Sequence, residues 1–141
     1  MDAVTNLAAN ELGDPGKVLL VLEAAKATNV VVQKELLDTY IFLLKEQRIL
    51  PFEYFFRFRP LPVSDLLHED LYNLSQAGFV RSASPIVITD HGLKWLGERV
   101  PPGQSETLLN QIGGPLATYS QMTQSELSRT VYAKLTKAIP R

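Results

Sequence analysis

One segment, residues 52–59, constrains the fold more than any other part of this chain. Its residues alternate with the period of two that is typical of an extended strand. One side would carry Phe52, Tyr54, Phe56 and Phe58, and the other would carry Glu53, Phe55, Arg57 and Arg59. Pro51 precedes the segment and Pro60 follows it. The pattern predicts one strand with a strongly apolar face, which other elements have to cover.

Helical patterns flank this predicted strand. Residues 14–28 carry an apolar stripe, with Asp14 as the expected N-cap and Pro15 in the first helical position. After a break at Asn29, a second stripe leads to a broad apolar face that we expect to end at Pro51. Ser64 is placed to cap a third helix over residues 65–76, and Gly78 is placed to end it.

The rest of the chain predicts a small ribbon and further helices. Two short β-type runs, residues 79–81 and 86–88, are joined by a Ser- and Pro-rich loop that is typical of a hairpin. Thr89 or Asp90 then caps a fourth helix that ends near Val100. After the Pro/Gly/Ser stretch at 101–105 we expect a short helix that stops at Gly113. A last helix begins at the capping box of Thr123 and Glu126.

This order of elements predicts a mainly α fold with a small β component. Three helices, an interposed strand and a terminal ribbon are the layout of a winged helix-turn-helix, in which the ribbon is the wing. We expect a flexible N-terminus over residues 1–13 and a winged-helix domain over 14–100. Residues 101–141 would form a helical tail, either packed on the domain or used in dimerisation.

Composition narrows the classes of function. The 141 residues include no cysteine and only two histidines, and the formal net charge is −1. No apolar run approaches the roughly 20 residues of a membrane span, and no secretory signal is visible, so we expect a cytoplasmic protein. Neither histidine, His68 or His91, has a second histidine or a carboxylate at the i+4 spacing of a helical zinc pair, and no nucleophile-elbow or phosphate-binding motif occurs. We therefore predict no catalytic residues, no metal and no cofactor.

Several motifs resemble the Panacea (SocA-like and YwgA-like) family of winged-helix proteins. The similar positions span residues 14–138 and include the stretch from Lys34 to Leu44, the aromatic run 52–58, the turn Leu61-Pro62-Val63-Ser64, the run Ile88-Thr89-Asp90-His91-Gly92, and Tyr119 with Ser125, Leu127 and Tyr132. The chain departs from the family where Leu61 replaces a glycine and Val63 replaces an aromatic residue. The resemblance implies a non-catalytic winged-helix module in an antitoxin-like or adaptor role.

Charge favours a protein partner over DNA. A helix that reads DNA needs a basic surface, but residues 65–76 include Asp65, Glu69 and Asp70 and no lysine or arginine. We therefore predict a protein-binding surface made by the side chains of Phe55, Asp65, His68 and Glu69. Phe55 is either an exposed anchor or part of the core, and the sequence leaves both open, as it does homodimerisation. The alternative is a DNA-binding regulator that uses Arg57, Arg59 and Arg81.

Overall fold

The computed structural model describes residues 12–138, and residues 1–11 and 139–141 lie outside that description. The described part is mainly helical, with two short hairpins. Its helices are α2 (Gly13–Ala27), α3 (Lys34–Glu46), α4 (Asp65–Gln76), α5 (Asp90–Gly97), α6 (Pro102–Ser120) and α7 (Gln124–Ala138). Its strands are β1 (Arg57–Phe58), β2 (Pro62–Val63), β3 (Val80–Arg81) and β4 (Val87–Ile88). Most of the predicted flexible N-terminus thus lies outside the described residues, and Gly13 already belongs to α2.

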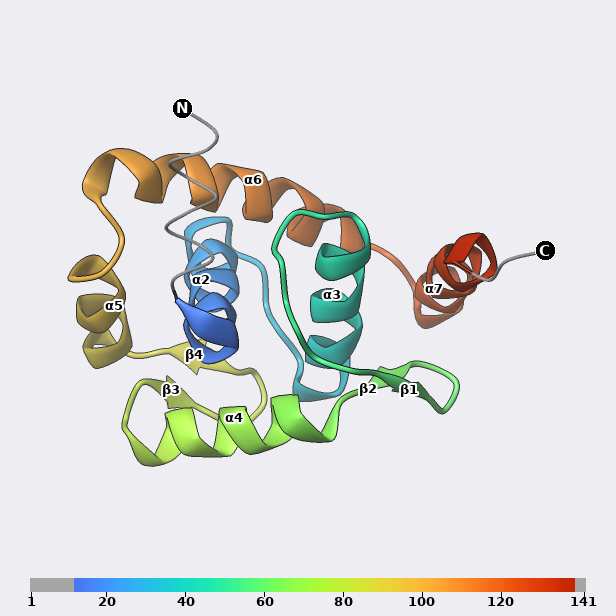
Figure 1. The fold of residues 1–141 in the computed structure, drawn as a ribbon, viewed down its shortest axis with the longest axis horizontal. Helices are drawn as coiled ribbons and strands as arrows, with labels where there is room; N and C mark the ends of the chain where they lie inside the picture. The colour runs from blue at the N-terminus through green and yellow to red at the C-terminus, as the bar shows by residue number, and fades with distance from the viewer. Residues whose placement is uncertain (1–11, 139–141) are drawn as a thin grey trace.

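Helix α2 is the centre of the core. Figure 1 shows it standing between α5 and α3, with α6 crossing one end and α4 the other. The apolar run from Val18 to Leu22 is buried on every side of the helix. A helix that is apolar all round is stable only when neighbours enclose it, and here those neighbours are α4, α5, α6 and β4. The tail beyond residue 101 therefore contributes to the same core, through Leu108, Ile112 and Leu116.

The predicted caps of α4, α5 and α7 are confirmed. The Ser64 hydroxyl accepts a hydrogen bond from the Leu67 N–H at the start of α4, and Thr89 does the same for Gly92 at the start of α5. Gly78 ends α4 with a φ of +81°, which glycine adopts without strain. Before α7, Thr123 and Glu126 exchange reciprocal side-chain to main-chain bonds, as a capping box requires.

In the first two helices, one boundary of each differs from the prediction. Helix α2 begins at Gly13, so Asp14 lies within its first turn and is not the N-cap. Its carboxylate instead accepts the main-chain N–H of Glu53. Helix α3 ends at Glu46 rather than at Pro51, because Arg48 adopts a left-handed φ of 58° that closes the helix.

The predicted strand over residues 52–59 is mostly wrong as a strand, although its alternation is right. Only Arg57 and Phe58 pair, with Val63 and Pro62 of β2. Phe52 and Tyr54 are buried and Phe55 is exposed, as a period of two requires. Within residues 12–138, no second strand pairs with residues 51–56, and side chains of α2 and α3 bond to their main chain instead.

Charged side chains take the place of that second strand. Lys17 Nζ donates to the carbonyl oxygen of Pro51 at 2.8 Å, and Lys45 Nζ donates to that of Tyr54 at 2.6 Å. Together with the Asp14 carboxylate on the Glu53 N–H, these bonds satisfy polar groups that a sheet would otherwise satisfy.

The predicted ribbon is confirmed as an antiparallel hairpin, in which Val80 pairs with Ile88 and Arg81 with Val87. On the β4 side, the N–H of Ile86, which directly precedes the strand, donates to the carbonyl oxygen of Val32. This hairpin and the β1–β2 hairpin are separate two-stranded sheets. The strand between α3 and α4 therefore pairs with β2 and not with the predicted wing.

The predicted short helix that stops at Gly113 is wrong. Helix α6 runs on through Gly113, Gly114 and Pro115 to Ser120. A Cβ at Gly113 would lie 2.7 Å from Cγ2 of Thr28, so this glycine allows α6 to approach the end of α2 closely. Among the described helices, none combines the length and the apolar character that crossing a membrane requires.

Candidate functional site

Exposed apolar side chains gather where the β1–β2 hairpin meets the first turn of α4. The Phe55 side chain is 89% exposed and that of Leu66 is 51% exposed. They border a hollow of about 320 Å³. Its lining residues, which we call the hairpin patch, are Phe55, Phe56, Arg57, Val63, Asp65 and Leu66. The structure thus resolves the alternative left open by the sequence: Phe55 is on the surface.

The neighbouring residue explains why Phe55 points outward. Tyr54 is buried, and its hydroxyl donates a 2.6 Å hydrogen bond to Oδ2 of Asp70 on α4. Burial, and then the Asp70 carboxylate, raise the pKa of Tyr54 far above its ordinary value, so the hydroxyl stays a neutral donor. Because adjacent residues in an extended chain face opposite sides, anchoring Tyr54 inward holds the Phe55 ring in solvent.

An ion pair crosses the hairpin patch. Arg57 Nη2 lies 2.9 Å from Oδ1 of Asp65, and both side chains are at least half exposed. Exposed pairs of this kind contribute at most about 1 kcal/mol to stability. Both charges are therefore available to a partner at little cost to the fold.

His68 lies on the other side of Val63 from the patch. Its Nε2 is 2.9 Å from the carboxylate of Asp38 on α3, and the imidazole is about half exposed. Asp38 is buried and also accepts the main-chain N–H of Ser64 at 2.8 Å. This carboxylate fixes the start of α4 against α3.

A second hollow, of about 280 Å³, adjoins this pair. It is lined by Lys34, Glu35, Asp38, Pro62, Val63 and His68. A histidine oriented by a buried carboxylate is also one part of a catalytic triad, but this lining supplies no hydroxyl or thiol to act as nucleophile. Within residues 12–138, no three His, Asp or Glu side chains converge as metal ligands.

Three of the four predicted partner-binding residues are thus divided between the two hollows. Phe55 and Asp65 share the hairpin patch, and His68 lines the second hollow. Glu69 is exposed on α4 and lines neither hollow.

The three predicted DNA-binding arginines are also divided. Arg57 and Arg59 belong to the β1–β2 hairpin, whereas Arg81 lies on β3 beside Lys26. The two hairpins flank the 12 residues of α4, a helix about 18 Å long. Figure 1 shows them toward opposite ends of that helix.

Sequence reasoning missed the charged residues that hold this region together. Lys17 is nearly fully buried beside the apolar run of α2, and Asp38 is buried within the apolar face of α3. A charge inside a core-facing stretch is itself a usable indication, because buried charges need a partner. What the sequence does not show is which distant group that partner is.

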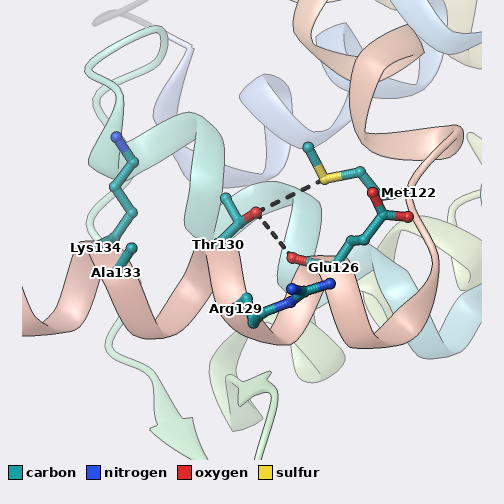
Figure 2. A pocket seen from close by; sticks show the side chains of 6 residues that line it. All are labelled: Met122, Glu126, Arg129, Thr130, Ala133 and Lys134. Carbon is teal, nitrogen blue, oxygen red and sulfur yellow. Dashed lines mark hydrogen bonds between the residues drawn. The ribbon is translucent and has the colours of Figure 1, made fainter.

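A further hollow, of about 500 Å³, lies along α7. Figure 2 shows its lining, with the Thr130 hydroxyl directed at the Met122 sulfur and at the main-chain oxygen of Glu126. The other lining side chains are Arg129, Ala133 and Lys134. This is an open groove on one helix, and its polar groups already have local partners or face solvent.

Comparison with known proteins gives no relative. No family model, no curated protein and no solved structure matches the chain. The resemblance to the Panacea family therefore stays a prediction, and function has to be argued from the site.

Proposed function

We propose that this protein is a non-enzymatic interaction module that binds a protein partner through the hairpin patch. One observation carries the proposal: a phenylalanine ring that is 89% exposed is held in solvent by a rigidly anchored neighbour. Aromatic anchors beside complementary charges are typical of binding hot spots. Here the ring of Phe55 lies beside Leu66 and the exposed Arg57–Asp65 pair.

We further propose that the architecture is a winged helix-turn-helix, with α2, α3 and α4 as the three helices and the β3–β4 hairpin as the wing. The order of the elements supports this assignment. Helix α4 would then occupy the position of a recognition helix, but it carries Asp65, Glu69 and Asp70 and no basic residue. That charge favours an antitoxin-like, adaptor or other regulatory role through protein contacts.

A site-specific photocrosslink tests the protein-binding proposal. A benzoyl-phenylalanine introduced at position 55 of the full chain, in cells that express it, should give one dominant crosslinked protein. The same group at position 132 is the matched control, since Tyr132 is 68% exposed on α7 and does not line the patch. A crosslinked product at 132 and none at 55 would show that the partner uses another surface.

Binding to random duplex DNA gives an independent check. Fluorescence anisotropy at low and near-physiological salt should show no tight binding, because α4 is acidic and the arginines are divided between two hairpins. Tight binding that weakens steeply with salt, and that is lost when Arg57, Arg59 and Arg81 are replaced by alanine, would instead establish the DNA-binding regulator.

A further inference from the structure

We infer that the partner docks as an extended segment that pairs with the outer edge of β1 and carries acidic side chains toward Arg57 and Arg59. This inference rests on the proposed function, because it specifies how a protein partner meets the hairpin. It has three supports: the direction of the main-chain groups of β1, the absence of a described element on that edge, and the charge of its outward face.

Pro62 determines which main-chain groups of β1 form hydrogen bonds with β2. Phe58 lies opposite Pro62, and proline has no N–H, so this pair cannot exchange hydrogen bonds. The bonded pair of the ladder is therefore Arg57 with Val63, and the Arg59 N–H donates to the carbonyl of Leu61 at 3.0 Å. Because these groups alternate along a strand, the N–H and C=O of Phe56 and Phe58 point to the opposite edge.

No described element bonds to that outer edge. Lys45 Nζ donates a hydrogen bond to the carbonyl oxygen of Tyr54. Within residues 12–138, no hydrogen bond involves the main chain of Phe56. Phe58 has none on this edge either. In the other hairpin, the N–H of Ile86, which directly precedes β4, bonds to the carbonyl oxygen of Val32. An exposed strand edge of this kind is a template for β-strand addition by a partner.

The side chains of β1 specify the chemistry of that partner. Arg57 and Arg59 share the outward face, and both are exposed. On the inward face the Phe58 ring packs edge-on against Phe42, yet 36% of the side chain remains exposed. A paired strand would therefore place acidic residues on the outward face and apolar residues on the inward face, in alternation.

Charge also argues against a second copy of this chain as the occupant. Antiparallel pairing of Phe58 with Phe58 of a second copy would set Arg57 opposite Arg59, and pairing of Phe58 with Phe56 would set Arg57 opposite Arg57. Like charges directly opposite each other destabilise a sheet. An acidic segment of a different protein has no such conflict.

Selection from a random peptide library displayed against the full chain tests this inference. We expect enriched peptides to alternate acidic and apolar residues, without proline. Their affinity, measured by anisotropy, should fall about tenfold or more for the double variant R57E/R59E. The matched control is Arg81→Glu on the β3–β4 hairpin, which should leave the affinity unchanged.

Amide hydrogen exchange distinguishes strand pairing from a purely electrostatic contact, because only strand pairing bonds the main-chain N–H groups of β1. A bound peptide should slow exchange at the N–H groups of Phe56 and Phe58, whereas that of Arg57 is already bonded to β2. Enriched peptides with no alternation, or no protection at Phe56 and Phe58, would overturn the inference. So would sedimentation that shows a dimer broken by R57E/R59E. The crosslink from position 55 would still report separately whether a protein binds the patch.

Discussion

The two hairpins of this protein have strands of the same length but differ in which of their groups are buried or bonded. Each is a pair of two-residue strands that flanks α4. The β3–β4 hairpin is buried on one face: Val80, Ile86 and Ile88 are buried, α5 packs against it, and the Ile86 N–H bonds to Val32, while Val87 on the other face is exposed. The β1–β2 hairpin exposes Phe55 at one side and leaves the outer edge of β1 uncovered by any described element.

This difference separates a structural hairpin from a candidate binding hairpin. The first contributes its apolar residues to the core. The second is anchored from behind by Tyr54 and by Phe42, so its exposed groups are not needed for folding. If that division is correct, substitutions on the two hairpins should affect stability and binding in opposite ways.

The largest effect is expected at Gly92, where α5 meets the β3–β4 hairpin. A Cβ here would lie 2.4 Å from the main-chain oxygen of Phe79 and 2.8 Å from Cγ1 of Ile88. Because main chain has to shift, Gly92→Ala should lower the free energy of unfolding by about 3 kcal/mol, measured by urea denaturation. The matched control is Gly97→Ala in the same helix. Apart from its chain neighbours and the main chain of its own helix, no atom lies within 4 Å of the added methyl group, and we expect a gain of up to about 1 kcal/mol.

A smaller effect is expected behind the β1–β2 hairpin. Tyr54→Phe removes the hydrogen bond to Asp70 and should cost about 1 kcal/mol at neutral pH. The loss should depend on pH. In the unfolded chain Tyr54 ionises near its ordinary pKa of 10.0, whereas in the fold its pKa is raised, so its stabilising contribution is complete below pH 10 and lost above it. The difference between wild type and variant should shrink accordingly in unfolding experiments above pH 10.

The smallest effect on stability is expected at the exposed ring. Phe55→Ser should change the free energy of unfolding by less than about 0.5 kcal/mol, because little of the side chain is buried. It should nevertheless abolish binding of the partner identified by crosslinking. A stability loss above 1 kcal/mol would show that the ring belongs to the core, and the contrast between the hairpins would then disappear.

The features that the sequence predicted well are local ones. The caps at Ser64 and Thr89, the capping box before α7 and the alternation around Phe55 depend on neighbouring residues, which the sequence displays directly. The β3–β4 hairpin, which has two residues in each strand, was predicted for the same reason.

The errors arose where distant residues decide the local structure. Residues 51–56 looked like a strand because their alternation is real, but the groups that bond to them belong to α2 and α3. Gly113 looked like a helix stop, because glycine often ends a helix. In the structure it lies inside α6 and contacts Thr28 at the end of α2, and a linear pattern does not show such a distant contact. Asp38 on α3, which bonds to the His68 side chain and to the main chain of Ser64, was overlooked for the same reason.

The side-chain bonds to residues 51–56 also bear on the order of folding. The bond from Lys17 to Pro51 joins positions 34 apart in the sequence, and that from Asp14 to Glu53 joins positions 39 apart. Such bonds form only after α2 and the turn beyond α3 have met, because closing the intervening loop costs entropy first. We expect this segment to order only once α2 and α3 have formed. The outward position of Phe55 therefore depends on the packing of α2 against a segment that lies 34 to 39 positions away in the sequence.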